Sequence, residues 1–328
     1  MIRSPSNKVG PVMTITLPLE IAAGALVATE AAAIASYQGI GRGDEKAADQ
    51  MAVDAMRRGL NAMAMKGRVV IGEGERDEAP MLYIGEEVGT GQGGEYDIAL
   101  DPLEGTTLTA KAMPNALAVL AIAPKDGLLH APDTYMDKIA VGPGYPAGVV
   151  DIDRSPIDNV MALANAKGVA PHQIGVCVLD RPRHSSIIES LRAVGARIHL
   201  ITDGDVAGVI YTTDPDTGID LYLGQGGAPE GVLAAAALKC VGGQFQGRLV
   251  FRNEDEKARA RRIGITDLGR TYLLNELVST DVIFSATGVT NGALVAGVKS
   301  TPKGFVTETL VLDSARKTER IVRTIHLA

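Results

Sequence analysis

The segment from residue 156 to residue 239 alternates between the apolar patterns of helices and of strands. We expect helices at 156–167, 184–194, 205–211 and 229–239, with strands at 174–179, 197–201 and 219–223. Strands joined by crossover helices lie parallel in one sheet, with right-handed connections. This alternation therefore predicts an α/β fold for the second half of the chain.

A polar cluster follows each of these strands. The clusters are Asp180–His184, Asp203–Asp205 and Gly224–Glu230. Because the carboxyl ends of parallel strands meet at one edge of a sheet, we expect the three clusters to converge on one crevice.

The first half of the chain has a different pattern. An alanine-rich helix is expected from Leu19 to Tyr37, and a second helix from its Asp44 cap to about Met65. Short strands without long helices between them follow at 68–71, 82–88, 96–100, 116–123, 128–130 and 139–141. This succession predicts an α+β part with a mixed or antiparallel sheet.

A boundary between two domains is expected near residue 150. Pro143, Gly144, Pro146 and Gly148 cluster where the pattern changes, and 328 residues suit about two domains of roughly 150 residues. The division is 1–150 and 151–328. The second part also contains a charged helix at 254–262 and tail strands around 282–286, 306–312 and 320–325.

Charge, aromatic content and hydropathy argue against nucleic acid and membranes as partners. The net charge of −7 and an aromatic content of 4% disfavour nucleic acid, which binds clustered Lys and Arg or stacked aromatic rings. No apolar run is expected to be long enough to span a membrane. An acidic chain can still bind small anions where metal ions or a few arginines reverse the local charge.

The two cysteines, Cys177 and Cys240, lie in apolar segments and form no disulfide framework. The leader Met1–Leu17 has no apolar core of the kind found in signal peptides. A cytoplasmic location is therefore the expectation.

The stretch Asp97–Thr109 combines a strand, a rigid corner and oxygen ligands. Pro102 forces Asp101 out of helical geometry, so the strand is expected to stop near Leu100. Glu104 shares this corner, and Gly105 and Thr106 follow. Two carboxylates beside free backbone amides suit a hard divalent cation carrying a phosphate.

Further acidic residues stand at breaks between elements. The set is Asp49, Glu73, Asp77, Asp101, Glu104 and Glu230. Any one of them alone is more often a helix cap or a solvated carboxylate, but together with the Asp101 corner they favour Mg²⁺ or Mn²⁺ over zinc. Arg181, Arg183 and Tyr135 are the expected phosphate and sugar contacts.

Other catalytic motifs are missing from the sequence. Gly224-Gln225-Gly226-Gly227 lacks the full dinucleotide fingerprint, and no Walker loop occurs. The five histidines are scattered, and His184 is expected to start a helix rather than act as a general base.

Several motifs together resemble class II fructose-1,6-bisphosphatase, including its dual fructose/sedoheptulose-bisphosphatase members, within the lithium-sensitive phosphatase superfamily. They are Thr29-Glu30-Ala31-Ala32, Gly41-Arg42-Gly43-Asp44, Ile71-Gly72-Glu73-Gly74-Glu75, Glu78-Ala79-Pro80-Met81-Leu82-Tyr83, Asp101-Pro102-Leu103-Glu104-Gly105-Thr106, Arg181-Pro182-Arg183-His184, Asp203-Gly204-Asp205 and Gly226-Gly227-Ala228-Pro229-Glu230-Gly231. The similarity runs from about Leu19 to the C-terminus.

The resemblance implies a layered α-β-α-β-α sugar-phosphatase fold, with a metal-binding part before residue 150 and a sugar-phosphate-binding part after it. It implies Mn²⁺- or Mg²⁺-dependent hydrolysis of the 1-phosphate of fructose 1,6-bisphosphate, in gluconeogenesis or the Calvin cycle. The implied metal ligands are Asp49, Glu73, Asp101, Glu104 and Glu230. The implied substrate contacts are Glu104, Gly105, Thr106, Tyr135, Arg181, Pro182, Arg183, Asp203, Gly204, Asp205 and Gly227.

Thr106, Asp77 and Glu230 are the implied catalytic residues, with Thr106 and Asp77 activating water. Two alternatives stay open: a phosphatase acting on inositol monophosphate, and a non-catalytic protein that binds sugar phosphate. The use of sedoheptulose 1,7-bisphosphate, the metal and the regulation are left open too. A homo-oligomer, either a dimer or a tetramer, is expected.

Overall fold

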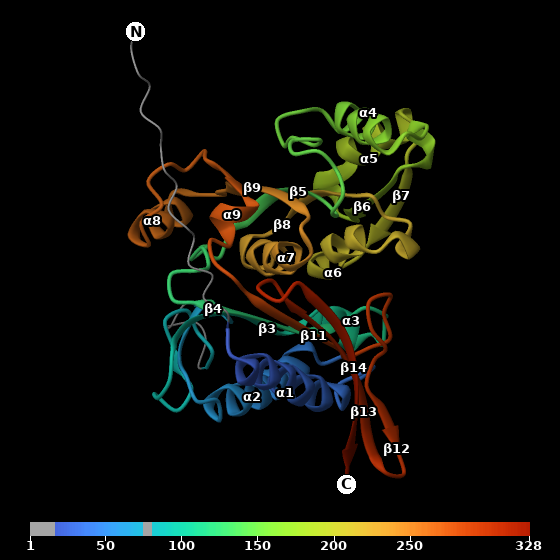
Figure 1. The fold of residues 1–328 in the computed structure, drawn as a ribbon. Coiled ribbons are helices and arrows are strands. Elements are labelled where there is room, and N and C mark those ends of the chain that lie inside the picture. Colours follow the sequence, from blue (N-terminus) through green and yellow to red (C-terminus); the bar gives the residue numbers. More distant parts are fainter. Residues whose placement is uncertain (1–16, 75–80) are drawn as a thin grey trace.

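The computed structural model describes residues 17–74 and 81–328, and its elements stack in five layers (Figure 1). The layers are α1 (Leu19–Tyr37) with α2 (Glu45–Asn61), an eight-stranded sheet, α6 (Asp205–Ile210) with α7 (Ala228–Val241), a six-stranded sheet, and α4 (Pro156–Lys167) with α5 (Ser185–Ala193). This order confirms the expected α-β-α-β-α fold.

The eight-stranded sheet combines strands from both ends of the chain. Its order is β12 (Lys299–Thr301), β13 (Gly304–Asp313), β11 (Ile283–Gly288), β4 (Leu117–Pro124), β3 (Glu95–Glu104), β1 (Lys66–Ile71) and β2 (Glu87–Val88), with β14 (Thr318–Leu327) paired to β13. Only β1 and β3 are parallel among its described neighbours. The sheet is therefore mixed, as expected.

The six-stranded sheet has the order β10 (Thr271–Leu273), β9 (Gln244–Val250), β5 (Tyr135–Val141), β8 (Leu221–Gly227), β6 (Gly175–Leu179) and β7 (Arg197–Ile201). Strand β6 is parallel to β7 and β8, which confirms the parallel unit. Strands β5, β9 and β10 are antiparallel to their neighbours. The shorter helices are α3 (Thr106–Ala110), α8 (Glu254–Arg262) and α9 (Leu274–Leu277).

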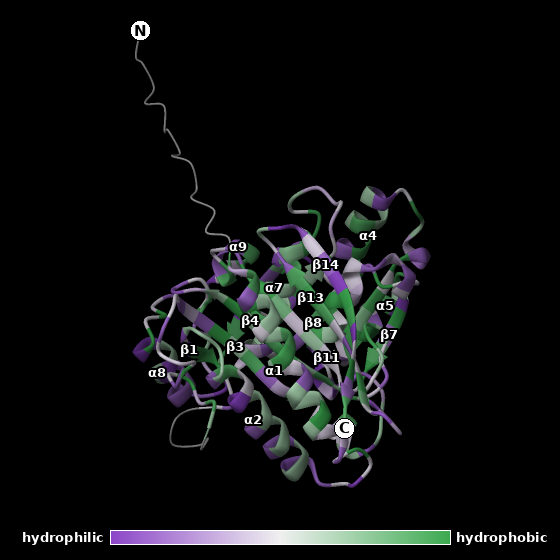
Figure 2. Cartoon of the chain, turned by 60° about the horizontal axis from the view of Figure 1, so that its bottom comes forward, coloured by the Kyte–Doolittle hydropathy of each residue, from purple (hydrophilic) through white to green (hydrophobic). Residues whose placement is uncertain are grey.

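Three hydrophobic cores fill the spaces between the layers. The central one surrounds α7, whose run from Ala234 to Ala237 is buried between the two sheets. The other cores lie under α1 and α2, and under α4 and α5. Hydrophobic residues dominate the central strands and α7, while α2 carries many hydrophilic residues (Figure 2). Small side chains in α7 let both sheets pack closely on one helix.

Helix α1 corrects the expectation about apolar runs. It is long and apolar enough to cross a membrane by length and composition alone. In this fold it packs on α2 and the eight-stranded sheet instead. The approach to α2 is close, because a Cβ at Gly59 would lie 2.9 Å from the Cα atom of Ala28. An alanine-rich helix is apolar, and its side chains are small enough for close packing in a core.

The structure corrects several element boundaries. Helix α2 ends at Asn61 rather than near Met65. The strand expected at 82–88 is reduced to Glu87–Val88, and the one at 128–130 is a single bridge between Leu128 and Val278. Strands β9, β10 and β12 were not expected from the sequence. These segments are short or weakly patterned, so pairing with neighbours decided their conformation.

The domain boundary near residue 150 stays a prediction. The sheets are not divided at that residue, because β5 precedes it and joins the six-stranded sheet. Strands β11 to β14 return from the second half of the chain to the eight-stranded sheet.

Candidate active site

Strand β3 carries an irregularity that turns two carboxylates toward the same space. It does not stop at Leu100 as expected but continues to Glu104, with a register shift against β4 between Asp101 and Glu104. The Leu103 N–H donates to Oδ1 of Asp101 at 3.0 Å. Such bulges redirect side chains near functional sites. Gly105 follows with φ of 88°, and α3 begins at Thr106.

A cavity of about 340 Å³ opens beside this corner. Its walls come from α2, the loop after β1, the end of β3, the loop before α6 and the first turn of α7. The lining residues are Asp49, Gly72, Glu73, Gly74, Ile84, Leu100, Asp101, Leu103, Glu104, Gly105, Thr106, Asp133, Asp203, Pro229, Glu230 and Leu233. The fold thus gathers all the described members of the predicted acidic set around one space. Asp133 also lines it and was not predicted.

Three of the carboxylates are close enough to share one cation. One oxygen each from Asp101, Glu104 and Glu230 lies within 4.8 Å of the other two. The Oε2 atom of Glu230 is buried and has no hydrogen-bond partner among the described residues. A buried carboxylate oxygen without a partner, on a residue grouped with two further carboxylates, fits a hard divalent cation. These residues therefore suit Mg²⁺ or Mn²⁺.

Several carboxyl groups that line this cavity have raised pKa values. Burial raises the pKa of Asp101 to about 6 and that of Glu230 to about 7. Burial, with the nearby charge of Asp101, also raises the pKa of Glu73 and Glu104 well above the usual range. Burial alone raises the pKa of Asp49. A bound cation would favour the ionised carboxylates and reverse these shifts.

Glycine at position 227 is required by the placement of Glu230. A Cβ on Gly227 would lie 1.9 Å from Oε2 of Glu230. Gly226 leaves similar room for Asp205, whose Oδ2 atom would lie 1.9 Å from an added Cβ. The glycine-rich end of β8 therefore makes space for carboxylates rather than for a dinucleotide.

A buried lysine, which the sequence analysis missed, lies behind the cavity. The Nζ atom of Lys138 is 2.6 Å from Oδ2 of Asp205, and the Tyr222 hydroxyl donates to the same oxygen at 3.3 Å. The backbone N–H of Val206 donates to Oε1 of Glu104 at 3.2 Å. Asp205 is thus held behind the acidic corner and is not part of the cavity lining. In the sequence, Lys138 is only one charged residue in an apolar strand, and this pattern does not indicate that it forms a buried ion pair.

The predicted sugar-phosphate contacts form a second group at the end of β8. Arg183 donates from Nε and Nη2 to the Gln225 carbonyl at 3.1 and 2.7 Å. Its guanidinium carbon lies 4.9 Å from the centre of the Tyr135 ring. Arg183 and Tyr135 therefore lie together, as a shared role in binding requires, although neither lines the 340 Å³ cavity.

His184 has a structural role. The Gln225 N–H donates to its Nε2 atom at 2.8 Å, so Nδ1 carries the proton that bonds to the Leu179 carbonyl at 2.7 Å. Burial lowers the pKa of His184. With both ring nitrogens occupied, the imidazole is not available as a base, as expected.

The remaining predicted residues are placed as follows. Arg181 is half-buried and donates from Nη1 to the Asp180 carbonyl, and Pro182 begins a short turn. Gly204 has φ of 83° and precedes α6. Neither Arg181, Pro182, Gly204 nor Gly227 belongs to the cavity lining. Asp77 lies outside the described residues.

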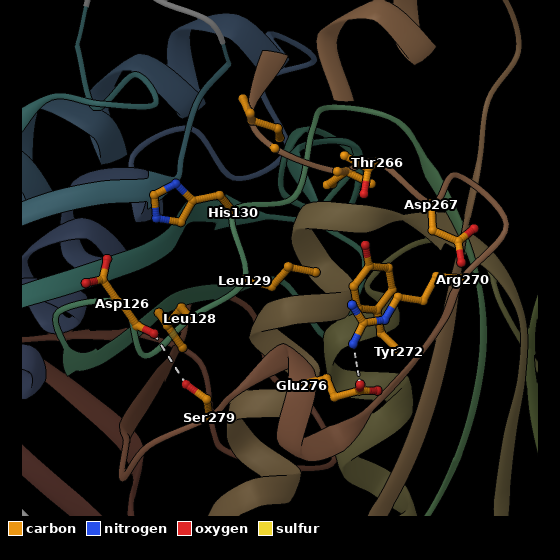
Figure 3. A pocket seen from close by; sticks show the side chains of 13 residues that line it. Asp126, Leu128, Leu129, His130, Thr266, Asp267, Arg270, Tyr272, Glu276 and Ser279 are labelled. Carbon is orange, nitrogen blue, oxygen red and sulfur yellow. Dashed lines mark hydrogen bonds and ion pairs between the residues drawn. The ribbon is translucent and has the colours of Figure 1, made fainter. Parts of the chain in front are cut away.

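A second cavity, of about 360 Å³, lies elsewhere in the molecule (Figure 3). It contains none of the predicted site residues. Arg270 is paired with Glu276 and lies 5.0 Å from the centre of the Tyr272 ring. Asp126 and Asp267 add further negative charge. Its carboxylates are not gathered like Asp101, Glu104 and Glu230, the group among the described residues whose oxygens lie within 4.8 Å of one another.

Residues 19–326 match the family described as bacterial fructose-1,6-bisphosphatase, glpX-encoded. The chain belongs to this family. A D-fructose 1,6-bisphosphatase class 2/sedoheptulose 1,7-bisphosphatase of Synechococcus elongatus is 44% identical over 340 aligned positions, covering 96% of this chain and 97% of the relative. A fructose-1,6-bisphosphatase 1 class 2 of Escherichia coli K12 is 45% identical over 312 positions, covering 91% and 92%.

Membership of the class II fructose-1,6-bisphosphatase family confirms the resemblance found in the sequence. It makes the chain a phosphatase, which is a hydrolase, whose family acts on sugar bisphosphates. The carboxylate cluster supplies the place where such an enzyme could hold a metal.

Proposed function

We propose that the chain hydrolyses the 1-phosphate of fructose 1,6-bisphosphate to fructose 6-phosphate and inorganic phosphate, and that sedoheptulose 1,7-bisphosphate is a second substrate. The observation that carries this proposal is the meeting of Asp101, Glu104 and Glu230 within 4.8 Å, beside a polar cavity. The names of the Synechococcus and Escherichia coli relatives support the choice of substrates.

Asp101, Glu104 and Glu230 would hold Mn²⁺ or Mg²⁺, with Asp49 and Glu73 contributing from elsewhere in the lining of the same cavity. A divalent ion held by these residues would neutralise phosphate charge and lower the pKa of a bound water. Thr106 orients the attacking water through its hydroxyl, and Asp77 accepts its proton. The water oxygen attacks phosphorus in line and becomes the fourth oxygen of inorganic phosphate, while the bond from phosphorus to the C1 oxygen breaks. The departing C1 oxygen takes up the proton that the water gave to Asp77, which yields the sugar hydroxyl.

The other end of the substrate would lie toward Arg183 and Tyr135. The Arg183 guanidinium, fixed by the Gln225 carbonyl, keeps N–H groups for the distal phosphate. Asp203 is half-buried at the cavity wall and can accept hydrogen bonds from sugar hydroxyls. This second anchor favours a bisphosphate over inositol monophosphate.

The decisive experiment compares phosphate release from fructose 1,6-bisphosphate, sedoheptulose 1,7-bisphosphate and inositol 1-phosphate, with Mn²⁺, with Mg²⁺ and with chelator. We expect metal-dependent release from the first two. Glu230→Gln should reduce turnover by at least about a hundredfold while leaving the thermal unfolding cooperative. Release from inositol 1-phosphate alone would favour the inositol phosphatase, and binding without any release would favour the non-catalytic alternative.

We also propose a cytoplasmic location and assembly as a homo-oligomer. The two cysteines are free in the structure, as suits a reducing compartment. The packing of α1 into a core is consistent with a role that does not involve a membrane.

A further inference from the structure

Strand β14 forms a long edge of the eight-stranded sheet. It pairs with β13 in unbroken antiparallel register from Gly304↔Leu327 to Asp313↔Thr318, and with no other described strand. The strand contains no proline, and its pairing with β13 has no bulge, so two common devices that protect edge strands are missing. Toward the C-terminus, β14 extends beyond the end of α1 (Figure 1).

The backbone groups at this edge can be assigned from one hydrogen bond. The Ala328 N–H donates to the Lys303 carbonyl at 3.0 Å, in continuation of the β13–β14 register. Hydrogen-bonded and non-hydrogen-bonded pairs alternate along an antiparallel ladder. The even-numbered residues of β14 therefore bond to β13, and the odd-numbered residues direct N–H and C=O groups to the free edge.

The same odd-numbered residues carry exposed side chains. Ile321, Ile325 and Leu327 are 52%, 48% and 79% exposed, and Glu319 and Arg323 are exposed beside them. On the other face, the even-numbered residues Val322, Thr324 and His326 are half-buried, and Arg320 is exposed near the start of the strand. One face of the edge thus presents apolar and charged side chains above unpaired backbone groups.

We propose that β14 pairs with β14 of a second copy of this chain, antiparallel across a two-fold axis centred on Ile321. A two-fold interface must be self-complementary, so one residue of β14 lies opposite its own copy. Centring on Arg320 sets two arginines together, and centring on Val322 or Thr324 sets Arg323 against an isoleucine. Centring on Glu319 or on Arg323 sets like charges directly opposite each other. Centring on Ile325 sets Arg323 against Leu327 of the second copy, without an opposite charge.

Only the register centred on Ile321 pairs opposite charges. It sets Ile321 against Ile321 of the second copy, and Glu319 against Arg323 of the second copy, twice by symmetry. Opposite-charge and apolar cross-strand pairs stabilise antiparallel sheets, while like charges directly opposite destabilise them. The eight-stranded sheets of the two copies then form one continuous sheet. The β14 edge of each copy is covered by β14 of the other.

Charge reversal tests this register. We expect Glu319→Arg and Arg323→Glu each to raise the dissociation constant of the dimer by about tenfold or more, because each places like charges together twice. The double variant should restore the wild-type value. The measurement is molecular mass against concentration by sedimentation or light scattering, with fructose 1,6-bisphosphate hydrolysis and thermal unfolding as controls for folding.

A cysteine pair tests the two-fold axis itself. Directly opposite residues in a hydrogen-bonded pair have Cα atoms about 5.5 Å apart, within reach of a disulfide. Ile321→Cys should therefore give a covalent dimer under mild oxidation, and Val322→Cys, on the other face, should not. A monomeric wild-type protein, single charge variants with unchanged mass, or equal cross-linking at both positions would overturn the proposal. A monomeric protein would leave this edge to a strand from a different protein, and either of the other two outcomes would point to another interface between the copies.

Discussion

The ammonium group of Lys138 lies 2.6 Å from Oδ2 of Asp205, and both side chains are buried, with 0% and 6% of their surfaces exposed. This pair sits directly behind the acidic cavity. The residue after Asp205, Val206, donates its N–H to Glu104. Lys138 of the six-stranded sheet thus positions Asp205 and Val206. Val206 in turn holds the carboxylate of Glu104, at the end of a strand of the eight-stranded sheet.

Replacing Lys138 with Met should destabilise the protein by about 3–5 kcal/mol, because it leaves the Asp205 carboxylate buried without its cation. Turnover should fall as well, because the Val206 N–H that donates to Glu104 would move. Lys125→Met, which removes the exposed pair with Glu95, is the control and should cost less than about 1 kcal/mol. Urea unfolding measures both variants. Equal effects at the two sites would contradict the positioning role.

Gly227→Ala should reduce kcat by about a hundredfold or more, because the new methyl group would lie 1.9 Å from Oε2 of Glu230 and displace that carboxylate. Gly269→Ala is the matched control, since a Cβ there meets only Oδ1 of Asp267, at 3.8 Å. Steady-state kinetics at saturating Mn²⁺ compare the two. Unchanged kcat in Gly227→Ala would rule out a need for Glu230 in its present position.

Arg183→Lys should raise KM for fructose 1,6-bisphosphate about tenfold with little change in kcat. Lysine cannot reproduce both the forked contact with Gln225 and the stacking on Tyr135. Arg252 lies over the same ring, 5.0 Å from its centre, but is bound to Glu256. We expect Arg252→Lys to leave KM almost unchanged. If the two variants shift KM alike, Arg183 has no special contact with the substrate.

The stability of the chelator-treated protein should fall as pH rises from 5 to 8. The native pKa values of about 6 for Asp101 and about 7 for Glu230 lie above the ordinary values of 3.8 and 4.5 expected in the unfolded chain. The native state therefore binds more protons in this window, and the free energy of unfolding decreases as these groups ionise. Thermal scans should show a decrease in Tm of a few degrees.

The slope with pH should be smaller in Glu230→Gln, which lacks one of the two titrating groups. Mn²⁺ should raise Tm more at pH 8 than at pH 5, because the ion binds the ionised carboxylates. A Tm of the chelated wild-type protein that stays level or rises across the window would refute the assignment of these carboxyls.

The sequence alone determined the features that depend on local physics. Helix α4 at 156–167 and strand β7 at 197–201 match their predicted limits, because hydrophobic periodicity and capping act within one segment. Asp101 and Glu104 were recognisable as neighbours because Pro102 and Gly105 restrict the chain between and after them. The motifs around them were enough to indicate the family.

Only the tertiary structure decided which distant residues meet. Glu230 reaches Asp101 because α7 lies between two sheets, an arrangement that no local pattern encodes. Lys138 appears in the sequence as one cation in an apolar strand, and its partner Asp205 follows 67 positions later. The free edge of β14 depends on which strand pairs with β13. Strand pairing and buried ion pairs join residues that are far apart in the sequence, and they depend on how the whole chain packs. The sequence pattern of each segment could therefore not specify them.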